Sequence, residues 1–295
     1  MGKSALKSSA SNAEAVTFKG GLVTESDNGR LDGTQATSQS LDIQGRSGCD
    51  SQLAHWKHRR TLVVLKTLGV DLPTSARVLD FGCGSGETIR TMREQGYLNV
   101  EGYDMVESTQ LSERRDHVTL GTSMDLRLPY EDNSFDLVIS DQVFEHVLDQ
   151  VTAFSELYRI TKPGGHGLHF IPARYMPIEG HIAIPFGGVM QHRWWYKLWA
   201  SAGVCNEGQK QRECSSDEIA DEDAYFAVEA TRYVPTSCYR VVWNRIGFEY
   251  RFVEEEFLRG HERPLMRNLG RVGLPIIWLY RTFRSRVVYL HKPGP

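Results

Sequence analysis

Residues 78–86, VLDFGCGSG, decide how the rest of the chain is interpreted. A short apolar strand carrying Asp80 runs into glycines at 82, 84 and 86, and SGETIRTMREQGY (85–97) then has a helical pattern. Glycine adopts positive φ and leaves its backbone amides unobstructed. A strand, a glycine-rich turn and a helix therefore predict a cradle for a nucleotide-like ligand. A dinucleotide fingerprint requires GxGxxG, whereas GxGxG after an acid favours another ligand.

Strand and helix patterns alternate on both sides of this turn. Apolar residues recur every three or four positions over 52–68 and 151–160, which predicts amphipathic helices. Strands are predicted at 76–81, 99–104, 117–123, 135–141, 165–172, 247–254 and 286–291. Such alternation is typical of an α/β domain, a parallel sheet with helices on both faces. Ligands of these folds bind at the carboxyl ends of the strands.

Composition limits the partners of the chain. With 295 residues, 40% hydrophobic content and a formal net charge of -3, it can bury one sizeable core but has no basic field for nucleic acid. Five cysteines without paired CxxC spacing suit a reducing cytoplasm, and we expect a cytoplasmic protein. No apolar run reaches the roughly 20 residues of a membrane helix.

The chain divides into segments of different composition. Residues 1–48 are rich in small polar residues and predict a flexible arm, either a tail or a segment that folds over the active site. We expect one domain over 49–295. Within it, 173–235 breaks the strand–helix alternation and predicts a substrate-side lid, and 259–286 predicts a basic and apolar helical insertion.

The glycine motif resembles motif I of the class I S-adenosylmethionine-dependent methyltransferases, of the type that act on small molecules. The resemblance continues in order through VEGYDM, LPYEDNSFDLVISDQVFEHVLD and ELYRITKPGGHGLHF, and covers about residues 75–172. It implies a Rossmann-like, doubly wound, mostly parallel seven-stranded sheet with a helical lid after strand five. It also implies S-adenosylmethionine as the cofactor.

The same resemblance assigns residues to the donor. Asp80 would organise the loop and the amino group of the methionine portion, and Gly82, Gly84 and Gly86 would allow the backbone to approach it. Asp104 would accept hydrogen bonds from the ribose hydroxyls.

Two positions concern the adenine of the donor. Met105 would pack on it or belong to the core. Family members commonly have an adenine-contacting acid where Met124 stands, and here Asp125 follows one residue later. Either Asp125 or the backbone of Ser123 and Met124 would then serve.

The residues after the fourth strand would line the methyl end of the donor. These are Asp141, Gln142, Glu145 and His146. If the acceptor is a hydroxyl, a general base helps, and His146 and Asp141 are candidates, although a structural role is an equal interpretation for both.

The insertion supplies candidate residues for the acceptor. Tyr175 and Glu179 would bind substrate, and His181 is a base, a substrate ligand or an ordinary loop histidine. Trp194 and Trp195 would either pack a lid or form an aromatic cage around a cationic acceptor. No metal is expected, because His166 and His169 would face opposite sides of a strand.

Three hypotheses follow from these patterns. The first is methyl transfer to a sugar or glycoconjugate hydroxyl, and the second is S- or N-methylation of an amino-acid-derived metabolite. The third, from another class, is an NAD-dependent oxidoreductase, since an acid after the second strand would bind the ribose of either cofactor.

Arginines recur near the end of the chain, at 259, 263, 267, 271, 284 and 286. They form either a solvated face or a surface for an anionic lipid or substrate.

Overall fold

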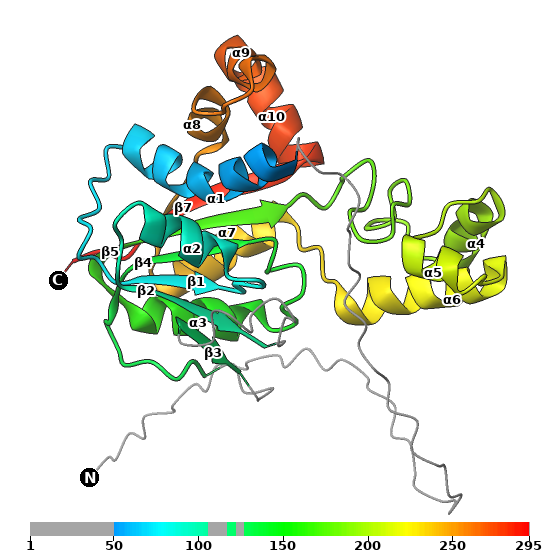
Figure 1. Cartoon of the computed structure of the whole chain (residues 1–295), viewed down its shortest axis with the longest axis horizontal. Coiled ribbons are helices and arrows are strands. Elements are labelled where there is room, and N and C mark those ends of the chain that lie inside the picture. The colour runs from blue at the N-terminus through cyan, green and yellow to red at the C-terminus, as the bar shows by residue number, and fades with distance from the viewer. Residues whose placement is uncertain (1–49, 106–116, 122–126, 295) are drawn as a thin grey trace, which may run out of the picture. The chain divides into compact units, whose positions relative to one another are not determined.

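The computed structural model describes residues 50–105, 117–121 and 127–294. The predicted arm (1–48) and two predicted adenine contacts, Met124 and Asp125, lie outside the described residues. The predicted fold class is confirmed: a seven-stranded sheet has the order β3-β2-β1-β4-β5-β7-β6 (Figure 1). Its strands are β1 (Val78–Phe81), β2 (Val100–Asp104), β3 (Val118–Leu120), β4 (Phe135–Asp141), β5 (Thr161–Pro172), β6 (Glu249–Phe252) and β7 (Ser285–His291).

The sheet is parallel except for β7, which pairs antiparallel with both β5 and β6. At its centre, β1 pairs parallel with β2 and β4, and all four residues of β1 are buried. Parallel strands end at the same edge of a sheet. Phe81, Asp104 and Asp141 are the last residues of β1, β2 and β4, so the segments that follow them meet there.

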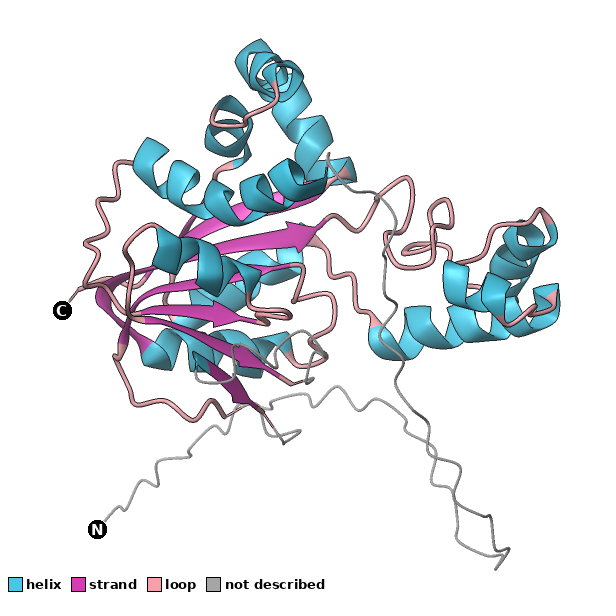
Figure 2. Ribbon diagram, viewed as in Figure 1, coloured by secondary structure: helices cyan, strands magenta, loops and turns pink. Residues whose placement is uncertain are grey.

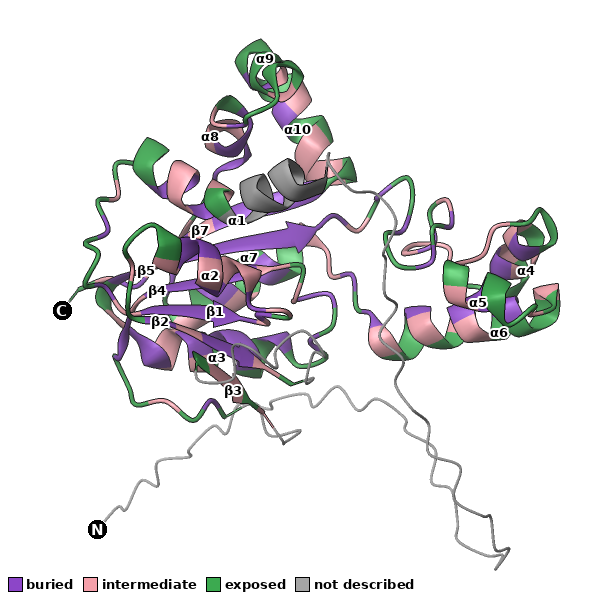
Figure 3. Ribbon diagram, in the orientation of Figure 1, coloured by how far each residue is buried: buried purple, intermediate pink, exposed green. Residues whose placement is uncertain are grey.

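Helices cover both faces of the sheet (Figure 2). On one face, α1 (Asp50–Thr67), α2 (Glu87–Glu94) and α8 (Glu254–Arg259) bury Val64, Met92 and Phe257 against the strands. On the other face, α3 (Gln150–Ile160) and α7 (Thr236–Ile246) bury Phe154 and Trp243. The helices predicted at 52–68 and 151–160 correspond to α1 and α3. Figure 3 shows that β1 and β5 are mostly buried between these layers.

The segment after β5 has a small core of its own. It contains α4 (Arg193–Ser201), α5 (Glu207–Gln211), α6 (Ser216–Tyr225) and a π-helical turn, η3 (Phe226–Ala230). Ile184, Tyr196 and Ala220 are buried in this core. Reciprocal capping hydrogen bonds begin α5 and α6, at Asn206 and Ser215, which satisfies backbone amides that a short helix otherwise leaves open.

The basic C-terminal segment forms two further helices, α9 (Pro264–Val272) and α10 (Leu274–Phe283). Pro264 begins α9. Arg286 does not belong to a surface stripe, because it is buried and donates to the carbonyls of Val234 and Pro172 at 2.7 and 2.5 Å. Across the described ranges, no helix has the length and apolar content needed to cross a membrane.

Candidate active site

A cavity of about 620 Å³ opens at the carboxyl ends of β1, β2 and β4. Three chain segments that are distant in sequence contribute to its wall: the glycine loop, the end of β2 and the turn after β4. The sequence-predicted residues that it brings together are Asp80, Gly82, Gly84, Asp104, Met105, Asp141, Gln142 and His146. Gly86, the third glycine of the motif, is the N-cap residue of α2.

The glycines of the loop are required for two different reasons. Gly82, Gly84 and Gly86 have φ of 75, 51 and 73°, a left-handed region that disfavours a side chain. A Cβ on Gly82 would come within 2.3 Å of Cγ2 of Val143, so this glycine allows the loop to pack against the turn after β4. A Cβ on Gly84 would meet nothing within 4 Å, and Gly84 therefore leaves space in the cavity.

Asp104 ties the glycine loop to the end of β2. Its carboxylate accepts a hydrogen bond of 2.7 Å from the Gly84 amide. The amides of Gly82 and Cys83 donate to the Tyr103 carbonyl at 2.7 and 3.2 Å. Met105 follows with 51% of its surface exposed and lines the cavity. An apolar side chain next to a carboxylate is an arrangement that suits the two halves of a nucleoside.

The turn after β4 places Asp141 and Gln142 on the other wall. Asp141 forms an ion pair with Arg60 of α1, whose guanidinium stacks 4.0 Å from the Phe170 ring centroid. The ion pair therefore joins the end of β4 to α1 through Asp141. Gln142 has φ of 58°, an uncommon conformation for a residue with a side chain, and its amide donates to the Phe170 carbonyl at 2.9 Å. Backbone strain of this kind is found at functional sites.

Residues 79–168 match the family model described as a methyltransferase domain. This segment is a methyltransferase domain. The resemblance to class I S-adenosylmethionine-dependent methyltransferases is thereby confirmed over these residues.

Known relatives match part of this chain over part of their own length. An uncharacterized methyltransferase of Schizosaccharomyces pombe is 32% identical over 135 residues, which are 41% of this chain and 49% of that protein. Phosphoethanolamine N-methyltransferase 2 of Caenorhabditis elegans is 29% identical over 142 residues, 46% of this chain and 32% of that protein. The chain thus spans about half the length of these curated relatives, or less.

Among solved structures, an S-adenosylmethionine dependent methyltransferase from Mesorhizobium loti aligns with a TM-score of 0.47 and 17% identity. The alignment covers 81% of this chain and 97% of that one.

His146 connects the cavity of the methyltransferase domain with the insertion after β5. Its ring lies 5.0 Å from that of His181, centroid to centroid, and its Nδ1–H donates to the Ala230 carbonyl at 2.8 Å. Burial lowers the pKa of His146. The structure therefore brings together the two histidines that the sequence proposed as bases.

Glu179 holds His181 in place. The buried Glu179 carboxylate accepts hydrogen bonds from His181 Nδ1 at 2.7 Å, from the Ile182 amide at 2.8 Å and from the Tyr233 hydroxyl. Burial alone would raise the pKa of Glu179, but these hydrogen bonds outweigh it and lower the pKa to about 2. The bond to Glu179 in turn raises the pKa of His181. The hydrogen bond from Nδ1 to Glu179 thus orients the His181 ring.

Glu145, predicted to line the methyl end of the donor, is not among the residues that line the cavity. Its side chain is 1% exposed, and among the described residues neither carboxylate oxygen has a hydrogen-bond partner. Burial raises the pKa of Glu145 to about 7. A buried polar group without a partner is costly and calls for an explanation. The adjacent glutamate and histidine after β4 were the only sequence signal for it.

Like Glu179, the other three residues predicted to bind substrate do not line the cavity of the methyltransferase domain. Tyr175 lines a separate pocket of about 350 Å³, together with Arg174, Arg240, Arg281 and Arg286. Trp195 donates through Nε1 to the Pro185 carbonyl at 2.7 Å and packs on the insertion core. Trp194 is 58% exposed and contacts Trp195 edge to face. The packing interpretation of the tryptophans fits this geometry better than a cage.

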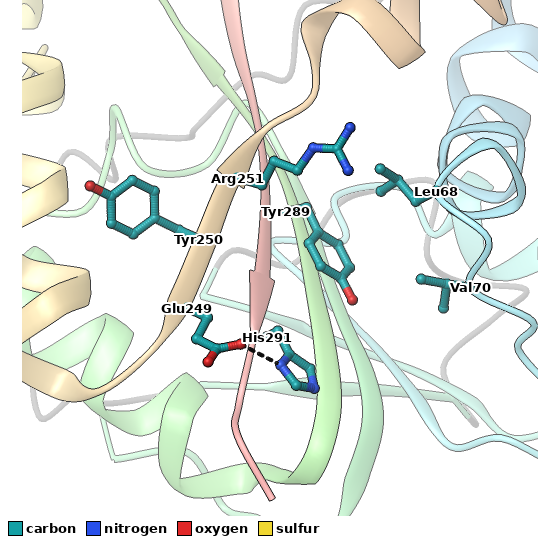
Figure 4. Close-up of a pocket in the computed structure, with 7 residues that line it drawn as sticks. All are labelled: Leu68, Val70, Glu249, Tyr250, Arg251, Tyr289 and His291. Atoms are coloured by element: carbon teal, nitrogen blue, oxygen red, sulfur yellow. Dashed lines mark hydrogen bonds and ion pairs between the residues drawn. The ribbon is translucent and has the colours of Figure 1, made fainter.

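A further pocket of about 330 Å³ lies at the β6–β7 edge of the sheet (Figure 4). Leu68, Tyr289 and Arg251 line it, and His291 bonds Glu249 across it at 3.1 Å. The register pairs His291 with His166, near the amino end of β5. This pocket is therefore at the end of the sheet opposite the glycine loop, and it shares no lining residue with the methyltransferase cavity.

Proposed function

We propose that this protein transfers a methyl group from S-adenosylmethionine to a small-molecule acceptor. One observation carries the proposal: the glycine loop, Asp104 and His146 share a single cavity of about 620 Å³. The methyltransferase domain matched over residues 79–168 supports it. The free thiols of the described cysteines suit a cytoplasmic location.

The donor would lie along the glycine loop. Asp104 has the acceptor oxygens that two ribose hydroxyls require, and the exposed Met105 side chain would pack on the adenine. The open backbone at Gly84 would admit the methionine portion, next to Asp80. The sulfonium and its methyl group would then point toward Gln142 and His146.

The transfer itself is an in-line displacement. A lone pair of the acceptor attacks the methyl carbon while the carbon–sulfur bond breaks, and S-adenosylhomocysteine leaves. Because the sulfonium already activates the methyl group, the protein contributes mainly alignment. A hydroxyl acceptor also loses a proton, and the imidazoles of His146 and His181 are the candidates for the base that takes it. His146 lines the cavity, and the His181 ring contacts that of His146.

The acceptor that we favour is the hydroxyl of a sugar or glycoconjugate, in a molecule that also carries an anionic group. Four arginines line the pocket around Tyr175. Arg281 is paired with Glu254 and Arg286 donates to backbone carbonyls, so Arg174 and Arg240 are the ones that we propose for an anionic group. Guanidinium groups suit phosphate recognition. The alternative is S- or N-methylation of an amino-acid-derived metabolite.

The proposal is tested by incubating the full chain with methyl-labelled S-adenosylmethionine and a metabolite extract, followed by mass spectrometry. We expect label in a phosphorylated sugar or a glycoconjugate. Label in an amine or thioether would favour the alternative, and release of no labelled product would contradict methyl transfer. With the acceptor in hand, turnover at saturating donor is measured for His146→Ala and His181→Ala. If neither falls tenfold, the base lies elsewhere.

A further inference from the structure

Three side chains beside the methyltransferase cavity converge in a way that methyl transfer does not require. Within residues 50–105, 117–121 and 127–294, one group has the residue types and spacing of a metal site: Glu145, His146 and His181. Each offers one ligand atom, and these atoms all lie within 4.8 Å of one another. Glu145 and His146 follow β4, whereas His181 comes from the insertion, so the fold rather than the sequence assembles the group.

The hydrogen bonds around the cluster determine which ring atoms can bind a ligand. His146 Nδ1 contacts the Ala230 carbonyl and His181 Nδ1 contacts the Glu179 carboxylate. Both partners can only accept, so both Nδ1 atoms carry the hydrogen. Each neutral imidazole then has its lone pair on Nε2. These atoms are acceptors, as are the oxygens of Glu145.

The carboxylate of Glu145 provides the second, independent observation. It is 1% exposed, its two oxygens have no hydrogen-bond donor among the described residues, and Oε1 lies 4.0 Å from His146 Nε2. Three groups that offer acceptor atoms around one point form an arrangement that a bound cation would neutralise and bridge. A buried carboxylate left alone would be strongly unfavourable.

We propose that Glu145, His146 and His181 bind a divalent first-row transition metal, with Zn²⁺ as the best match. Two imidazoles and one carboxylate with open positions are a ligand set used by catalytic zinc and non-haem iron. Ligand atoms about 2.1 Å from a tetrahedral metal ion are about 3.4 Å apart. The cluster, whose atoms lie within 4.8 Å of one another, would therefore contract by up to about 1.4 Å on binding the ion.

The surroundings match those of a metal-binding imidazole. Ligating histidines usually donate their other N–H to a carboxylate or a backbone carbonyl, which fixes the ring and raises its basicity. Glu179 does so for His181, and the Ala230 carbonyl does so for His146. Phe226 packs on both rings, at 5.3 Å from His181 and 6.5 Å from His146 between centroids, and shields them.

The role of this metal site in the reaction rests on the proposed function, whereas metal binding itself does not. A cation there would bind the oxygen of a hydroxyl acceptor and lower the pKa of that hydroxyl, which would then release its proton to water. The imidazoles would act as ligands, and no free histidine base would be needed. Metal binding itself can be measured without any methyl transfer.

The test uses the full chain after treatment with a chelator, titrated with Co²⁺ and followed by visible absorption, and with Zn²⁺ by calorimetry. We expect one ion per chain, with Glu145→Gln and His181→Asn each weakening affinity at least tenfold. Glu179→Gln should weaken it about 10- to 100-fold at unchanged stoichiometry. The control is His166→Asn, whose ring bonds the Tyr289 hydroxyl in the sheet at 2.7 Å and should bind metal as the unaltered chain does.

Two results would overturn the proposal: no stoichiometric binding of either ion, or equal affinity in Glu145→Gln and His166→Asn. Thermal unfolding of each variant shows that the fold is intact, and Glu145→Gln keeps the shape of the side chain. S-adenosylmethionine affinity is measured on the same metal-free protein. Donor binding without metal binding would refute this inference alone, and metal binding without donor binding would refute the proposed function alone.

Discussion

Replacing Gly82 with alanine tests whether the glycine loop depends on its close approach to the turn after β4. The residue has φ of 75°, and an added Cβ would lie 2.3 and 2.7 Å from Cγ2 and Cγ1 of Val143. A left-handed alanine costs about 1 to 2 kcal/mol, and overpacking adds about 1 to 3 kcal/mol. We expect Gly82→Ala to lower the free energy of unfolding by about 2 to 5 kcal/mol.

The two contributions to this loss can be separated. Val143→Ala removes both γ carbons and leaves Cβ at 3.1 Å, so the double variant should regain the packing part but keep the backbone part. The assay is urea unfolding of the four proteins in a double-mutant cycle, with a coupling energy of about 1 to 3 kcal/mol expected. A coupling energy near zero would refute the contact between Gly82 and Val143.

Three further outcomes are expected. Gly84→Ala should lower the free energy of unfolding by only the backbone part, about 1 to 2 kcal/mol, because an added Cβ would meet nothing within 4 Å. It should nevertheless weaken S-adenosylmethionine binding measured by calorimetry, and unchanged affinity would contradict the place of Gly84 in the cavity. Asp141→Asn should lower the unfolding free energy by about 1 to 3 kcal/mol, since the ion pair with the largely buried Arg60 is lost; a thermal melt identical to the unaltered protein would contradict this. Burial lowers the pKa of His169 from 6.5 to about 3, so the unfolded chain takes up the proton first as pH falls, and the contribution of His169 to the unfolding free energy should drop by about 2 kcal/mol between pH 7 and 5. The difference in unfolding free energy between His169→Gln and the unaltered protein should shift by this amount between the two pH values, and an unchanged difference would refute it.

The regular elements and the donor side of the cavity could be predicted because they depend on local patterns. Apolar periodicity predicted α1 and α3. The glycine motif predicted the turn after β1, and Asp104 is the acid at the end of the next predicted strand. Strand alternation also separated His166 from His169. His166 bonds Tyr289, whereas His169 bonds Ser140 at 2.8 Å and packs on the α3 face.

The acceptor side could not be predicted, because it depends on contacts between distant segments. No local pattern shows that Arg60 pairs with Asp141, that Tyr175 shares a pocket with four arginines, or that the buried Arg286 donates to backbone carbonyls. The sequence predicted Glu179 as a substrate ligand, but in the structure its carboxylate accepts hydrogen bonds from His181, Ile182 and Tyr233. Only the folded chain brings His181 to His146.

Calorimetric titration of the full chain with S-adenosylmethionine, and separately with NAD, tests the central claim most directly. We predict saturable binding of S-adenosylmethionine, weakened in Asp104→Ala by about 1.5 to 3 kcal/mol, or roughly 10- to 150-fold. Asp104→Asn can still accept a hydrogen bond from the Gly84 amide. This variant therefore separates the loss of the ribose contact from the loss of the hydrogen bond that holds the glycine loop. Tight binding of NAD with no heat from S-adenosylmethionine would contradict the account.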